Sequence, residues 1–194
     1  MRQTTKRDLA AETTEPKENF MMHMSLADVL RLTMFGTLIG VSNFLLILPI
    51  GIPGHTSIYW MGLLVLGKGL LPKPGSGTIM GIVSGILAIV FGLGKEGPLL
   101  AFKYIIPGIL LDVLAIMFLY QLESVWVGGI TGALISLSKL LVNIALGVIL
   151  QIPMVFLTMG FGYASLLHAI FGAIGGVMAS VLIKRLKPRM EAFS

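Results

Sequence analysis

The sequence predicts an all-α, polytopic membrane protein with six transmembrane helices and both termini in the cytoplasm. Of its 194 residues, 56% are hydrophobic and only 12% are charged, and the mean hydropathy is +0.94. Soluble domains average about 25% charged residues, so most of the surface of this protein has to face something other than water. The apolar residues also gather in six runs, most of them close to the length that crosses a bilayer.

The chain begins with a polar segment, residues 1–24, that carries charges of both signs and shows no apolar period. It lacks the apolar core and the small-residue cleavage site of a signal peptide. We therefore expect a mobile cytoplasmic tail or a short surface helix over residues 1–24. A six-helix substrate-binding domain over residues 25–187 and a short basic tail over residues 188–194 are expected to follow.

Six apolar spans come next, separated by segments rich in proline, glycine and polar residues. A helix needs about 20 residues to cross about 30 Å of hydrocarbon. The second and third spans are shorter than the others, so we expect them to be tilted, kinked or partly covered by their neighbours. The predicted spans are 28–49, 56–71, 77–94, 103–120, 126–150 and 163–184.

The basic residues predict the orientation. With the N-terminus inside, the inner segments carry eleven of the 14 lysines and arginines, the outer segments carry Lys95 and Lys103, and Lys139 lies within a span. This positive-inside bias places both termini in the cytoplasm. It also explains the net charge of +5 without a nucleic-acid-binding surface. The loops expected to face outward are 50–55, 94–102 and 151–162.

Glycines spaced four residues apart predict how the spans pack. Small residues at this spacing let two helices approach closely in a membrane, where the hydrophobic drive between helices is absent. Packing within the chain accounts for most of these stripes, whereas Gly36 and Gly40 on the first span are also candidates for an outward-facing stripe that docks a partner. The other stripes are Gly77-x-x-x-Gly81-x-x-x-Gly85, Gly128-x-x-x-Gly132 and Gly172-x-x-x-Gly176.

Two charged residues, Asp112 and Lys139, lie deep within their spans and are therefore informative. A charge at the bilayer centre costs from about 3 to above 10 kcal/mol, so it needs a partner or a function. Asp112 on the fourth span and Lys139 on the fifth have similar predicted depths below the outer face. We expect them to pair, either as a structural ion pair or as part of a ligand site.

The outer halves of the spans hold more polar and aromatic residues than the inner halves. This asymmetry predicts a polar, aromatic-lined cavity that opens outward. Trp60 and Tyr163 also fit an interfacial aromatic belt, and His168 also fits a helix-to-helix hydrogen bond. The predicted substrate-binding residues are Asn43, His55, Tyr59, Trp60, Lys103, Asp112, Lys139, Asn143, Tyr163 and His168.

Several function classes are excluded or disfavoured. The absence of cysteine excludes a disulfide scaffold and a cysteine-based zinc site, and His55 with His168 lacks a clear third metal ligand. No metalloprotease, nucleophile-elbow or phosphate-loop motif is present, so we expect no catalytic residues, no cofactor and no metal. A channel is disfavoured because the inner halves are apolar. Uphill transport then requires a partner that hydrolyses ATP or an ion gradient.

About 190 residues, six spans, cytoplasmic ends and an outward polar cavity resemble the substrate-binding S components of energy-coupling factor (ECF) transporters. The resemblance implies capture of a vitamin or related micronutrient, followed by delivery through a transmembrane coupling subunit and two ATPase subunits. That family docks through a small-xxx-small stripe on its first helix, usually of alanines. Gly36 and Gly40 occupy the matching positions here.

A local match extends over about 60 residues and resembles the YkoE-like S components, which are assigned to hydroxymethylpyrimidine and thiamine. It comprises Tyr59-Trp60, Lys73-Pro74-Gly75, Gly92, Gly97-Pro98 and Gly108-x-x-x-Asp112. That family has glutamate at the last position and further glutamates on its third helix, where this chain has Gly81 and Ala88. Without those carboxylates, Lys139, Lys103 and His55 suit a neutral or anionic ligand at least as well as a cationic one.

Three alternatives stay open from the sequence. The first is a self-sufficient secondary transporter that uses Asp112 and Lys139 as its ion-coupling pair. The second is a membrane-embedded enzyme acting on lipid or prenyl substrates, which lacks a supporting motif. The third is a structural protein, which leaves the outer polar residues without a role.

Overall fold

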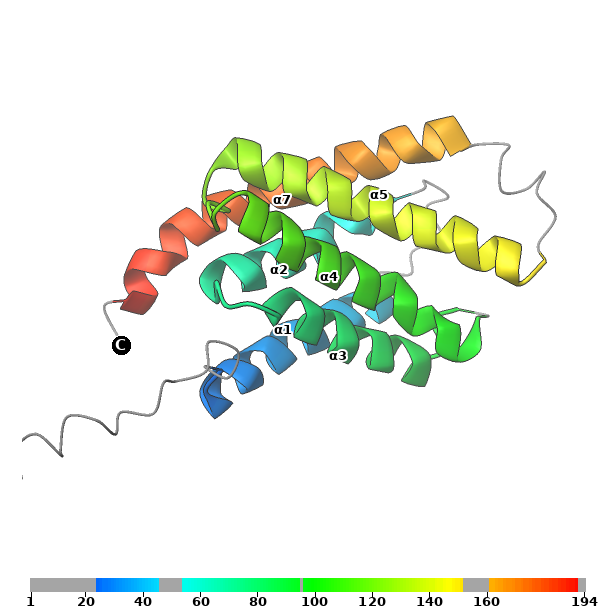
Figure 1. Cartoon of the computed structure of the whole chain (residues 1–194), viewed down its shortest axis with the longest axis horizontal. Helices are drawn as coiled ribbons and strands as arrows, with labels where there is room; N and C mark the ends of the chain where they lie inside the picture. The colour runs from blue at the N-terminus through cyan, green and yellow to red at the C-terminus, as the bar shows by residue number, and fades with distance from the viewer. Residues whose placement is uncertain (1–23, 46–53, 95, 152–160, 192–194) are drawn as a thin grey trace, which may run out of the picture.

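The computed structural model describes residues 24–45, 54–94, 96–151 and 161–191. Within these residues the chain forms six α-helices and one 3-10 helix, so the predicted all-α class is confirmed for this part (Figure 1). Each α-helix overlaps one of the six predicted spans. The elements are α1 (Leu26–Leu45), α2 (Ser57–Leu70), α3 (Ser76–Val90), η1 (Gly97–Ala101), α4 (Phe102–Met117), α5 (Val125–Ile149) and α7 (Phe161–Glu191).

Three of the described helical segments are long and apolar enough to cross a membrane: Gly97–Met117, Val125–Ile149 and Phe161–Arg189. The first joins η1 to α4. Helices α2 and α3 are apolar but shorter, with 14 and 15 residues. The chain is thus a membrane protein, and its described residues contain three candidate spans. Helix α7 continues to Glu191, so the predicted boundary of a separate tail at 188 falls inside the helix, and residues 1–23 lie outside the described part.

Helix α1 begins with a reciprocal cap. The backbone N–H and the hydroxyl of Ser25 donate to Oδ2 of Asp28 over 3.0 and 2.8 Å, and the backbone N–H of Asp28 donates to the Ser25 hydroxyl over 3.2 Å. This arrangement satisfies backbone donors that the first helical turn leaves free. Lys73, in the connection between α2 and α3, pairs with the same carboxylate at 2.5 Å and so ties that connection to α1.

The connection between α2 and α3 is short because its residues favour a tight turn. Pro72 and Pro74 cannot continue a helix, and Gly75 caps α3 with a φ of +78°, which favours glycine. Figure 1 shows α5 and α7 side by side along one face of the molecule, with α1 and α3 at the opposite face and α2 and α4 between them. Helix α7 packs against both α5 and α2, while α3 packs against α4 and α1.

The glycine stripes lie where helix backbones meet. A Cβ on Gly132 or Gly176 would collide with the backbone of the facing helix in the α5–α7 contact. In the α3–α4 contact, a Cβ on Gly77 would lie 2.6 Å from the carbonyl oxygen of Gly108. These contacts confirm that the stripes on α3, α5 and α7 pack within the chain, as expected for helices that associate through close backbone approach.

The stripe on α1 also faces inward, so the prediction of an outward-facing docking stripe is wrong. Gly36 and Gly40 are buried. A Cβ on Gly36 would lie 2.8 Å from Cβ of Val83, and one on Gly40 would lie 2.9 Å from Cβ of Leu87, both on α3. The two glycines allow α1 to approach α3 and are therefore not available to a partner.

The core consists mainly of aliphatic side chains contributed by all six α-helices, together with the rings of Trp60 and Tyr104. Among its fully buried members are Leu32, Ile39, Met61, Leu64, Met80, Leu111, Ile135 and Ile183. The opposite faces of the helices also carry large apolar side chains, which are exposed in the isolated chain. Such a surface suits contact with lipid. Examples are Leu38, Ile86, Val113, Leu141, Leu166 and Met178.

Candidate ligand-binding site

Lys139 lies over two aromatic rings inside the helix bundle. Its Nζ is 3.9 Å from the ring centroid of Trp60 and 5.0 Å from that of Tyr104. The two rings contact each other with centroids 5.9 Å apart and an interplanar angle of 54°. Helices α5, α2 and α4 each contribute one of these side chains. We call Lys139, Trp60 and Tyr104 the lysine–aromatic cluster.

The aromatic rings of this cluster hold the lysine in place. Trp60 is 1% exposed and Tyr104 is 5% exposed, whereas Lys139 retains intermediate exposure. An ammonium over an aromatic face is attracted by the ring quadrupole, by roughly 2 kcal/mol when the pair is desolvated. The indole N–H of Trp60 is buried and has no hydrogen-bond partner among the described residues. Lys139 therefore lies against the face of a buried indole ring.

A second polar group lies one helical turn away. Nδ1 of His168 on α7 is 3.4 Å from the Ser57 hydroxyl on α2 and 3.2 Å from the Ser136 hydroxyl on α5. Ser57 precedes Trp60 by three residues, and Ser136 precedes Lys139 by three residues. Because residues three apart are neighbours on a helix surface, His168 and its two serines lie next to the lysine–aromatic cluster.

Lys103 and Glu96 form an ion pair at the start of α4, with Nζ and Oε1 2.5 Å apart. Burial by itself would raise the pKa of Glu96, but the hydrogen bond from Lys103, one from its own backbone N–H and the lysine charge lower it below the usual value. Oε2 of Glu96 is buried without a hydrogen-bond partner among the described residues. Lys103 is therefore a neutralised cation, unlike Lys139.

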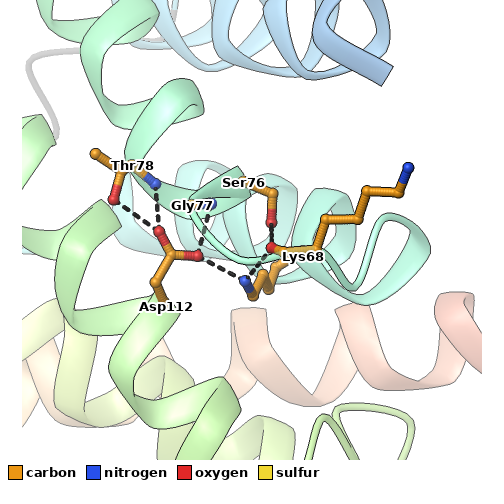
Figure 2. Close-up of polar contacts among 6 residues, drawn as sticks. Lys68, Ser76, Gly77, Thr78 and Asp112 are labelled. Atoms are coloured by element: carbon orange, nitrogen blue, oxygen red, sulfur yellow. Dashed lines mark hydrogen bonds and ion pairs between the residues drawn. The ribbon is translucent and has the colours of Figure 1, made fainter. Parts of the chain in front are cut away.

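Asp112 pairs with Lys68 and not with Lys139, so the predicted Asp112–Lys139 pair is wrong. Nζ of Lys68 lies 2.6 Å from Oδ1 of Asp112. Figure 2 shows the lysine side chain directed at this carboxylate. Lys139 instead contacts Tyr104, which precedes Asp112 by eight residues on α4. Eight residues correspond to a rise of about 12 Å, so the two charges sit at different levels of the bundle.

Asp112 also caps helix α3 from a neighbouring helix. Its Oδ1 accepts the backbone N–H of Gly77 at 3.0 Å, and its Oδ2 accepts the backbone N–H and the hydroxyl of Thr78 at 2.8 and 2.7 Å (Figure 2). Free N–H groups and the helix dipole both favour a carboxylate at a helix N-terminus. Lys68 further donates to the carbonyl of Lys73 at 2.7 Å. This saturated network has a structural role and leaves no group for a ligand.

The remaining predicted site residues are not brought into the lysine–aromatic cluster. The side-chain amide of Asn43 donates to the Ile39 carbonyl in its own helix, at 3.0 Å. Asn143 is exposed, and Tyr59 and Tyr163 are 53% and 62% exposed. Exposed tyrosines at helix ends suit an interfacial aromatic belt. His55 is partly buried in the segment before α2.

Sequence reasoning missed Lys68, Tyr104 and the two serines that contact His168. The sequence does contain a signal for Lys68, because it is a charged residue inside the apolar run 57–70. The positive-inside count places Lys68 among the basic residues at the inner face, yet it is 0% exposed in the structure. Ser57 and Ser136 carry no such signal, since serine is ordinary in membrane helices.

Comparisons with known proteins yield no relative. No protein-family model, no curated protein and no solved structure matches this chain. Among the described residues, no group of three or more histidine, aspartate or glutamate side chains is arranged to hold a metal ion. Evidence for the function therefore comes from the lysine–aromatic cluster and its surroundings.

Proposed function

We propose that this protein is the substrate-binding membrane subunit of an ECF-type importer, with all six helices spanning the bilayer and both termini in the cytoplasm. It captures a vitamin or related micronutrient from outside. A separate transmembrane coupling subunit and two ATPase subunits then complete the import. The observation that carries the proposal is the lysine–aromatic cluster, a cation held inside an apolar bundle without an acidic partner among the described residues.

A lysine set against buried aromatic rings, with no acidic partner among the described residues, supports ligand binding better than a structural role. An uncompensated charge in a membrane protein costs several kcal/mol, so it persists where a ligand or an ion uses it. The neighbouring imidazole and hydroxyl groups of His168, Ser57 and Ser136 add directional hydrogen bonding. Apolar walls with a few placed polar groups are typical of small-molecule sites.

The alternative hypothesis, an ion-coupled secondary transporter, is weakened by the contacts of Asp112. That hypothesis depends on an Asp112–Lys139 coupling pair. The carboxylate oxygens of Asp112 instead accept hydrogen bonds from Lys68 and from the N-terminus of α3. A carboxylate with four donors has little freedom to bind and release a coupling ion. We therefore keep the binding subunit as the proposal.

The proposal is tested by separating binding from transport. The purified chain in detergent is screened by thermal shift against vitamins and their precursors, because a ligand that binds the folded state stabilises it by mass action. The same chain in proteoliposomes without ATPases is then assayed for uptake of any ligand found. Binding without accumulation is the expected result. Accumulation driven by an ion gradient would overturn the proposal in favour of a permease.

Two variants connect the binding to the cluster. Lys139→Gln and Trp60→Leu are expected to weaken binding at least about tenfold, which corresponds to about 1.4 kcal/mol. Their matched controls are Lys187→Gln, a half-exposed lysine in an ion pair with Glu123, and Trp126→Phe, an indole that is 83% exposed. Unchanged affinity in both site variants would place the ligand elsewhere.

A further inference from the structure

We infer that the ligand is a small monoanion bearing a carboxylate, and that Lys139 is the residue that recognises its charge. This inference rests on the proposed function and names the substrate class of the same site. Trp60 and Tyr104 act as positioning residues that hold the lysine ammonium toward the ligand. The distribution of charge in the described part of the chain supports this assignment.

Every acidic side chain that the structure describes already has a lysine partner. The pairs are Asp28–Lys73, Glu96–Lys103, Asp112–Lys68 and Glu123–Lys187. The described arginines and lysines that lack an acidic partner are exposed, with one exception. That exception is Lys139, which has intermediate exposure, lies against two buried rings and makes no hydrogen bond to another described residue.

The missing counter-charge is therefore expected to come from the ligand. Aromatic rings orient an ammonium but do not neutralise it, since a ring supplies a quadrupole and no net charge. A charge-assisted hydrogen bond between an ammonium and a carboxylate is about twice as strong as one between neutral groups. A cationic ligand such as thiamine would instead meet an uncompensated like charge in a medium that screens it poorly.

One lysine indicates a carboxylate and not a phosphate. Sites for dianionic phosphate groups gather several donors, typically arginine forks or the free N–H groups of a helix N-terminus. Here the second lysine of this region, Lys103, is neutralised by Glu96, and the α3 N-terminus is capped by Asp112. A single ammonium beside His168 and two serines matches one negative charge plus neutral polar groups.

The test compares acids with their neutral counterparts on the full chain in detergent. Equilibrium dialysis is run with nicotinate and nicotinamide, biotin and biotinamide, lipoate and lipoamide, pantothenate and pantothenol, and with thiamine as the cationic probe. In at least one pair, the acid is expected to bind at least about tenfold more tightly than its neutral counterpart. Equal affinity for acid and neutral form, or a preference for thiamine, would overturn the inference while leaving the proposed function intact.

Variants of Lys139 assign the preference to this residue. Lys139→Gln is expected to lower the affinity for the acid about tenfold and to leave that for the neutral form unchanged, while Lys139→Arg keeps the preference. A Lys139→Gln protein that still prefers the acid would overturn the inference. The ratio measured on the unmodified protein stands even if a variant fails to fold. Absence of binding to every probe would count against the proposed function and remove the inference with it.

Discussion

The ammonium of Lys68 lies 2.6 Å from the carboxylate of Asp112, although 44 residues separate them in the chain. Lys68 is 0% exposed and Asp112 is 8% exposed. The pair joins α2 to α4, and the hydrogen bonds from Gly77 and Thr78 bring in the start of α3. A single carboxylate thus joins three helices at one end of the bundle. The ammonium of Lys68 also lies 5.2 Å from the ring centroid of Tyr120.

Removing both partners of this pair is expected to cost less stability than the sum of the two single losses. Lys68→Met or Asp112→Leu alone leaves an uncompensated buried charge or unfilled N–H groups, at a cost of about 3–5 kcal/mol. The double variant removes both charges, so its loss is expected to fall well below the sum of the single losses. Reversible unfolding in mixed micelles gives the four free energies of the cycle.

The surface pair of Lys187 and Glu123 provides the control for this cycle. Its atoms are 3.6 Å apart and the two side chains are 39% and 48% exposed. An exposed pair contributes about 0–1 kcal/mol, so its cycle is expected to be nearly additive. Additive losses for Lys68 and Asp112 would show that the buried pair does not hold the helices together.

The partner of Asp112 illustrates what sequence can and cannot predict in this chain. Depth along a helix follows from residue counting, so an intramembrane charge is readily recognised as unusual. Which face a side chain occupies depends on how the helices rotate and pack, and this information is absent from a single hydrophobic run. By its position in the sequence Lys68 belongs with the lysines that set the topology, yet packing places it in the core.

Helix number and close packing were easier to predict because local sequence determines them. Proline and glycine clusters end the helices at Pro72–Gly75 and near Gly94, and apolar runs between such breaks form the helices. Glycines at a spacing of four mark close helix contacts wherever they occur. The sequence does not say whether a stripe faces the chain itself or a partner, and this is why the role of Gly36 and Gly40 was mispredicted.

Gly176 on α7 tests the importance of backbone contact with α5. A Cβ at this position would collide with the carbonyl group of Gly128, and backbone has little room to move. Gly176→Ala is therefore expected to destabilise the protein by about 2–3 kcal/mol, as overpacking does. The matched control is Gly162→Ala in the same helix, where a Cβ would have nothing within 4 Å. Equal thermal stability of the two variants would contradict close packing of α5 on α7.

The Glu96–Lys103 pair is expected to make the stability of the protein sensitive to acid. Because the pKa of Glu96 in the folded protein is lowered from the usual 4.5, its stabilising effect is fully present above pH 4.5 and is lost as the pH falls through the lowered value. The melting temperature of the unmodified protein is therefore expected to fall more steeply than that of Glu96→Gln between about pH 5 and pH 3. Comparing the two proteins isolates the contribution of Glu96, because the rest of the chain is the same in both. Identical pH profiles would contradict the Glu96–Lys103 pair.

Lys139 is expected to lower the stability of the empty protein, because a site that waits for an anion holds an unneutralised charge. Lys139→Met keeps the length and the contact with Trp60 and Tyr104 but removes the charge, so it is expected to raise the free energy of unfolding by about 1–2 kcal/mol. Lys103→Met, which breaks the pair with Glu96, is expected to lower it. Thermal unfolding of the ligand-free proteins measures both changes. A destabilised Lys139→Met protein would show that the aromatic rings alone compensate the ammonium, and that the lysine holds the helices together without a ligand.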